Sequence, residues 1–179
     1  MKTTAIYHNL SFAEAKTYLF ATLFVAGNIL LPQLAHFVPN GGPMLLPIYF
    51  FTLIAAYKFG IRTGMLTALL SPVVNSLLFG MPAAAMLPII LIKSSLLAIA
   101  AASAAHYFKK VNLLTLVAVV LSYQIAGTLI EWIFVKDFFI AVQDFRIGLP
   151  GMALQVVGGW ILLSIVYSQQ STVDRKPGL

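Results

Sequence analysis

Polar side chains are rare in the hydrophobic segments of this chain, and those that occur are the candidates for chemistry. Lys93 lies in the apolar stretch 86–100, with no polar residue in the six positions before it. A cation near the middle of a bilayer costs about 2.5–3.5 kcal/mol on insertion scales. We therefore expect Lys93 to face a bundle interior, a cavity or a partner side chain.

Further polar residues are expected at similar or shallower depths when each helix is given a rise of about 1.5 Å per residue. They occur on or next to several hydrophobic segments, with Gln124 and Glu131 on the same one: His36, Asn75, Gln124, Glu131 and Gln155. The opposite halves are apolar and small, as in residues 97–105. A few convergent polar groups in an apolar lining are typical of small-molecule sites. The sequence thus predicts an outward-facing substrate pocket with an apolar floor.

Each of these residues also has a purely structural interpretation. Lys93 could extend toward an interface or form a salt bridge with Glu131. Asn75 and Gln124 could form hydrogen bonds between helices, and His36 could be an interfacial histidine. Glu131 could be a helix-end charge beside Trp132, an aromatic residue of the membrane interface.

Composition places these residues in a membrane. Of the 179 residues, 60% are hydrophobic and 9% charged, against about 25% charged in soluble domains. A span needs about 20 apolar residues. We predict an all-α integral membrane protein, a single domain (1–179) of six transmembrane helices with polar tails at 1–10 and 169–179.

Turn and cap signals give approximate bounds for the spans. Ser11 and Glu14 form a capping-box pattern, and Asn112 is placed to cap a helix. The predicted spans cover residues 12–32, 43–59, 63–78, 83 or 88 to 108, 113–134 and 149–167. The charged and aromatic segment 135–148 is expected to lie at an interface.

The basic residues predict the orientation. Most fall on one side of the predicted spans: Lys2, Lys16, Lys58, Arg62, Lys109, Lys110, Arg175 and Lys176. Only Lys136 and Arg146 fall on the other. The positive-inside rule then places both termini in the cytoplasm.

The sequence lacks the residue patterns on which several classes of enzyme depend. The sequence has no cysteine, and it contains no HExxH, GxSxG or Walker pattern. We expect no catalytic residues, no metal site, no cofactor and no enzymatic activity. The basic residues are scattered singly and form no basic patch, which argues against a nucleic-acid partner.

Small residues suggest a second kind of surface. The first span carries Ala15, Ala21, Thr22 and Ala26, and Thr22 and Ala26 have the small-xxx-small spacing that lets helices approach closely. This pattern fits either packing within the bundle or contact with a partner membrane protein.

The layout resembles a known family. Six short helices with inside termini, LPIYFFTLIAAYKFG at 46–60 and LTALLSPVVN at 66–75 are similar to the substrate-binding S-components of energy-coupling factor (ECF) transporters. The resemblance implies uptake of a vitamin or other micronutrient across a prokaryotic cell membrane. It also implies a transmembrane coupling protein, contacted through small residues of the first helix, and two cytoplasmic ATPases that hydrolyse ATP.

With Lys93 in the pocket, we expect a small anionic solute. Two alternatives remain open: a non-transporting scaffold of the rod-shape morphogenetic type, and a membrane-embedded enzyme that modifies lipids. The scaffold would need no polar outer pocket, and the enzyme would need a nucleophile or metal cluster that the sequence does not display.

Overall fold

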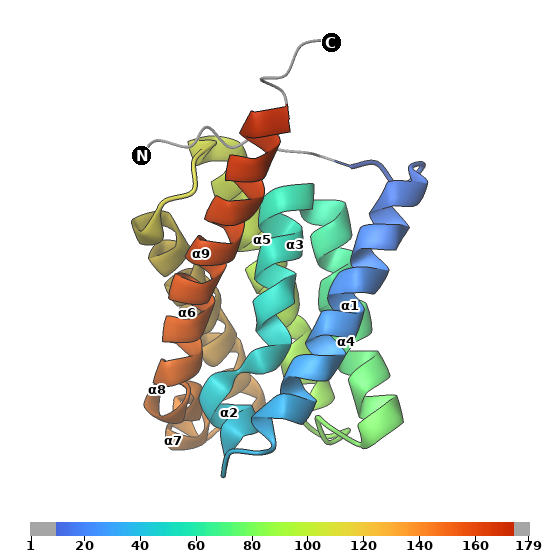
Figure 1. Cartoon of the computed structure of the whole chain (residues 1–179). Helices are drawn as coiled ribbons and strands as arrows, with labels where there is room; N and C mark the ends of the chain where they lie inside the picture. The colour runs from blue at the N-terminus through green and yellow to red at the C-terminus, as the bar shows by residue number, and fades with distance from the viewer. Residues whose placement is uncertain (1–9, 174–179) are drawn as a thin grey trace.

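The computed structural model describes residues 10–173, and these residues form a bundle of helices (Figure 1). Residues 1–9 and 174–179 of the predicted tails lie outside the described residues, whereas residues 169–173 continue the last helix. The helices run in the order α1 (Ala15–Ala35), α2 (Gly41–Leu45), the 3-10 turn η1 (Pro47–Tyr49), α3 (Phe50–Phe59), α4 (Ile61–Phe79), α5 (Leu87–Phe108), α6 (Leu113–Val135), α7 (Phe138–Ala141), α8 (Gln143–Ile147) and α9 (Leu149–Val173).

Five of the described helices, α1, α4, α5, α6 and α9, are long and apolar enough to cross a membrane. This is the architecture of an all-α, multi-pass membrane protein. The remaining apolar helix, Pro47–Phe59, is shorter. At about 1.5 Å per residue it rises roughly 20 Å, less than the roughly 30 Å of a hydrocarbon core. A sixth span therefore stays a prediction.

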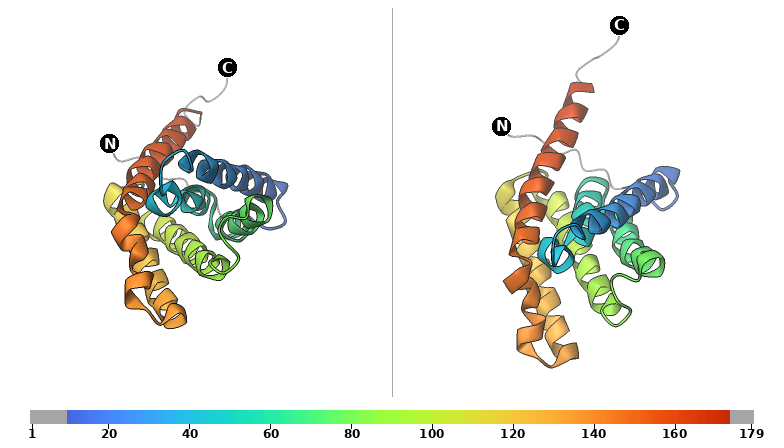
Figure 2. Two further views of the ribbon diagram at one scale, coloured as in Figure 1. Left: turned by 90° about the horizontal axis from the view of Figure 1, so that it is seen from below. Right: turned by 60° about the horizontal axis from the view of Figure 1, so that its bottom comes forward.

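The short helix α3 occupies the centre of the bundle. It packs against α1, α4, α5 and α9, and the view from below shows these helices around it (Figure 2). Residues 52–58 are all buried. At Gly64, an added Cβ would lie 2.4 Å from the Cβ of Ala56, so glycine lets α4 approach α3 closely. A helix without a polar face belongs in such an interior.

Local sequence explains where the helices begin and end. The side chain of Asn112 accepts a hydrogen bond from the amide of Leu114 at 3.1 Å and caps α6 as predicted. Asp137 caps α7 by accepting from the amides of Phe139 and Ile140. Gly60, with φ of 91°, separates α3 from α4 in a conformation that favours glycine.

Some predicted boundaries are wrong by a few residues. The capping pattern at Ser11 and Glu14 closes a turn ahead of α1, which begins at Ala15, not at residue 12. The predicted span 43–59 is interrupted at Leu46, whose left-handed backbone (φ 46°) ends α2 before η1 starts. The predicted interfacial segment folds into the short helices α7 and α8.

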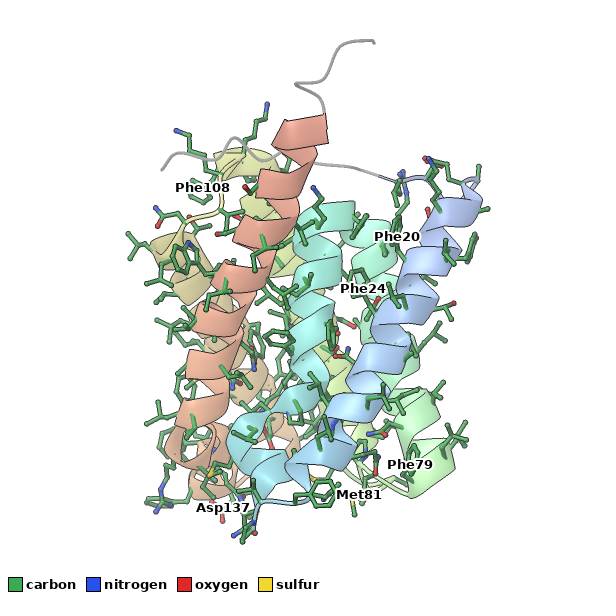
Figure 3. The ribbon with its side chains drawn as sticks, viewed as in Figure 1. Phe20, Phe24, Phe79, Met81, Phe108 and Asp137 are labelled. Atoms are coloured by element: carbon green, nitrogen blue, oxygen red, sulfur yellow. The ribbon has the colours of Figure 1, made fainter. Side chains whose placement is uncertain are left out.

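The two ends of the bundle differ in charge. The start of α1, the α3–α4 junction, the end of α5 and the end of α9 share one end, whereas α2, α7 and α8 lie at the other (Figure 1). Figure 3 marks them with Phe108 at the first end and Met81 and Asp137 at the second. Among the described basic residues, Lys136 directly follows α6 and Arg146 lies in α8, and both are at the second end. Lys16, Lys58, Arg62, Lys109 and Lys110 fall at the first end, and Lys93 lies inside the bundle on α5.

Candidate functional site

A cavity of about 380 Å³ lies at the end of the bundle that carries α2, α7 and α8. Its walls come from α1, α2, η1, α4 to α8 and the loop before α5. Most lining residues are apolar: Pro32, Pro43, Leu46, Pro47, Ile48, Met81, Pro82, Ala83, Met86, Ile89, Ile90 and Ile140. The polar ones are His36, Tyr49, Asn75, Lys93, Glu131 and Gln143. Size and lining are those of a small-molecule site.

Lys93 and Glu131 form an ion pair at this cavity. The Lys93 Nζ donates to Glu131 Oε2 at 2.5 Å, joining α5 to α6. Lys93 is 2% exposed and Glu131 5% exposed. The salt bridge that the sequence left as an alternative is therefore formed, while both residues still line the cavity. Because the charges cancel, the isolated cation no longer gives a reason to expect an anionic solute.

A glycine on α6 makes room for this pair. A Cβ on Gly127 would lie 2.6 Å from Cγ of Lys93 and within 3.3 Å of Cδ and Cε. The lysine stem thus lies across α6 at Gly127, one turn before Glu131. The aliphatic stem is packed against backbone while the ammonium reaches the carboxylate.

Two other predicted residues also reach the cavity. Asn75, on α4, is 2% exposed, and its Oδ1 accepts from Nε2 of Gln33 on α1 at 3.4 Å. His36 follows α1 and is exposed at the rim. Side chains from three predicted spans and the end of a fourth, α1, therefore meet at one cavity.

The last two predicted pocket residues, Gln124 and Gln155, do not line this cavity. Both are fully buried, on α6 and α9. Oε1 of Gln155 accepts from the hydroxyl of Tyr123 at 2.9 Å. Tyr123 in turn packs against Tyr49, a cavity residue, with ring centroids 5.5 Å apart. Gln155 is thus connected to the cavity through two tyrosines.

Several buried polar atoms without hydrogen-bond partners lie on α5, α6 and α9. Nε2 and Oε1 of Gln124, Nε2 of Gln155 and the hydroxyls of Ser94 and Thr128 are buried and form no hydrogen bond. We call Ser94, Gln124, Thr128 and Gln155 the inner amide cluster. A buried group without a partner costs about 1–3 kcal/mol, so these unpaired atoms lower the stability of the fold.

A different polar cluster, on α1, α3 and α4, is fully paired. Asn28 Nδ2 donates to Oγ1 of Thr52 at 3.0 Å and to Oγ of Ser71 at 3.1 Å. Its Oδ1 accepts from the amide of Phe51 at 3.0 Å, one of the free donors at the start of α3. Ser71 donates onward to the carbonyl of Thr67. We call Asn28, Thr52 and Ser71 the Asn28 network.

The opposite end of the bundle is closed by buried side chains. Tyr57 donates to the carbonyl of Lys110 at 2.6 Å, and Lys58 Nζ lies 3.7 Å from the centre of the Tyr167 ring. Tyr57, Lys58 and Tyr167 are all 4% exposed or less, and Leu97, on α5, is fully buried below the cavity. Leu97 is apolar, as predicted for the floor, but Gln124 and Gln155 are buried and polar.

The four small residues of the predicted partner surface differ in their exposure to solvent. Ala15, Thr22 and Ala26 are exposed on α1, whereas Ala21 is 3% exposed and packs inside the bundle. Ala21 therefore cannot contribute to an outer docking surface in this conformation. Nothing in the described residues gathers three His, Cys, Asp or Glu side chains in a metal-binding group.

Sequence reasoning missed Tyr49 and Gln143 as cavity residues. Tyr49 lies two residues after Pro47, within the predicted continuous span 43–59, where nothing marks it as a cavity residue. Gln143 belongs to the charged and aromatic segment 135–148, which the sequence predicts to lie at an interface. The only signal for a cavity role is that this segment falls at the same end of the predicted bundle as the other polar residues.

Comparisons with protein-family models, with curated proteins and with solved structures find no match to this chain. The function is therefore argued from the cavity and its side chains.

Proposed function

We propose that this protein is the substrate-binding subunit of an ECF-type uptake transporter, which captures a small micronutrient from outside a prokaryotic cell. The observation that carries the proposal is the cavity of about 380 Å³, built from α1, η1, α4, α5 and α6 at one end of the bundle. A scaffold protein has no need of a cavity in which buried Asn75, Lys93 and Glu131 converge.

The charge distribution supports the direction of capture. Lys16, Lys58, Arg62, Lys109 and Lys110 lie at the closed end. By the positive-inside rule that end faces the cytoplasm, so the cavity faces outward. A solute can then enter from outside, but the packed tyrosines at the other end prevent it from passing through a rigid bundle. Delivery requires motion driven by partners.

The proposed partners are a transmembrane coupling protein and two cytoplasmic ATPases. In the described residues there is no metal-binding group, and the sequence has no nucleotide-binding loop. The exposed small residues Ala15, Thr22 and Ala26 give α1 a surface that another helix can approach closely. The protein itself is proposed to bind and not to catalyse.

Filling the cavity tests this function. Ala83 lines the cavity from an exposed loop, and its neighbour Ala84 is equally exposed but lies outside the lining. Ala83→Trp should remove the small molecule that co-purifies with the wild-type protein, measured by mass spectrometry of extracts, because the indole occupies the solute's space. Ala84→Trp is the matched control and should retain it.

Two results would contradict the proposal. One is a wild-type protein that retains no small molecule when it is purified from cells grown in rich medium. The other is equal retention by Ala83→Trp and Ala84→Trp, which would place the molecule outside this cavity.

A further inference from the structure

We infer that the inner amide cluster is the specificity site for the solute, and that it recognises a neutral planar group carrying adjacent hydrogen-bond donor and acceptor atoms. Lactams, carboxamides and ring systems such as pyrimidinones have this edge. The inference rests on the proposed function and names the class of solute. It replaces the anionic solute that Lys93 alone predicted.

The missing partners are the first argument. Six buried side-chain N and O atoms lack hydrogen bonds among the described residues, and five belong to the inner amide cluster. Buried polar groups in native proteins are almost always paired with protein or with an ordered molecule. A concentration of unpaired atoms on α5, α6 and α9 indicates a site that a polar molecule completes.

Depth along the helices places this cluster directly beyond the cavity. Glu131 lines the cavity, and Gln124 lies seven residues earlier on α6, about 10 Å deeper. Thr128 lies between them on the same helical face. On α5, Ser94 follows Lys93 by one residue and is fully buried. The cavity and the cluster therefore lie at two successive levels along α6.

The side chain of Lys93 separates the two levels. Its stem crosses α6 at Gly127, between Gln124 and Glu131, and its ammonium is held by Glu131. Lysine has a long flexible stem, so rotation away from Gly127 would uncover Thr128 and Gln124. In this conformation the ion pair lies between the cavity and Gln124 along α6.

The chemistry of the free atoms selects the solute group. Gln124 offers an N–H donor and a carbonyl acceptor in one plane, and Gln155 offers a further N–H donor. A glutamine amide pairs bidentately with an edge that has one donor and one acceptor, as with adenine. The Lys93–Glu131 pair is neutral overall, and burial of an uncompensated charge beside it would be costly. A neutral edge is therefore favoured over an anion.

Saturation-transfer NMR on the full chain in lipid nanodiscs tests this assignment. The probes are 2-pyridone, which has adjacent C=O and N–H groups, N-methyl-2-pyridone, which lacks the donor, and benzoate, an anion. We expect the wild-type protein to bind 2-pyridone about tenfold more tightly than either other probe. Gln124→Leu should abolish this preference, and Gln155→Met gives a second, independent removal of a free amide.

Ser122→Ala is the control, because Ser122 lies on α6 but is exposed and bonds only to the carbonyl of Val119 among the described contacts. It should retain the wild-type preference. Equal binding of the two pyridones, or preferred binding of benzoate, overturns the inference. If Ala83→Trp still blocks that binding, the cavity's proposed function survives. If no probe binds and no small molecule co-purifies, both proposals fail.

Discussion

The Asn28 network and the inner amide cluster are both buried and polar, yet only one of them is complete. In the network, each side-chain atom of the Asn28 amide has a partner within 3.1 Å. In the cluster, neither atom of the Gln124 amide has one. The Asn28 network therefore connects α1, α3 and α4. The inner amide cluster keeps unpaired hydrogen-bonding atoms, which is why we propose it as a binding site.

The Lys93–Glu131 pair stands between these two cases. It is satisfied, as in the network, but it lines a cavity beside the cluster. Buried ion pairs contribute little net stability, because desolvation offsets their attraction. Separating the two charges without new partners is costly, so in this conformation the pair holds α5 to α6 beside the cavity.

Breaking this pair should give the largest loss of stability. Glu131→Leu leaves the Lys93 ammonium buried without its carboxylate, and we expect the free energy of unfolding to fall by about 3–5 kcal/mol. The measurement is an SDS titration of the protein in mixed micelles.

The matched variant is the double substitution Lys93→Met with Glu131→Leu. Because it removes both charges, it should recover most of the loss. A double variant that is as unstable as Glu131→Leu would show that the two residues do not form a mutual pair.

The network should give the next largest effect. Asn28→Leu removes three hydrogen bonds and leaves the Phe51 amide at the start of α3 without its acceptor. We expect a loss of about 2–4 kcal/mol in the free energy of unfolding, measured by the same titration. Gln33→Leu is the control, since its single bond to Asn75 is long, 3.4 Å, and should cost less than about 1 kcal/mol.

A loss for Asn28→Leu no greater than that for Gln33→Leu would contradict the structural role of the network. The Asn28 network would then no longer serve as an example of a paired, structural cluster.

Depth was readable from the sequence, but direction around each helix was not. Residue counting placed Asn75, Lys93 and Glu131 at one end, where they meet at the cavity, and it named Glu131 as the rival partner of Lys93. The helices are apolar on nearly all sides, so their patterns do not distinguish a cavity face from a helix contact. For that reason Gln124 and Gln155 were expected in the open pocket and lie beneath it.

The fold was predictable to a similar degree. Composition identified an all-helical membrane protein, and Asn112 marked the start of α6. Asn28, by contrast, satisfies the start of α3 from 23 residues away, a long-range contact that no local pattern specifies. Leu46 adopts a left-handed backbone although leucine carries no turn signal, so the break between α2 and η1 could not be seen.

The smallest expected change in stability comes from Gln124→Leu, and it tests the central claim most directly. The protein is purified from cells in wild-type and variant forms, and both its free energy of unfolding and its content of co-purified small molecule are measured. If Gln124 is an unpaired binding residue, the unfolding free energy of the solute-free protein should be unchanged or up to about 1 kcal/mol higher, while the small molecule is lost. A variant that is clearly less stable yet retains the molecule would contradict the account, because Gln124 would then be a structural residue like Asn28.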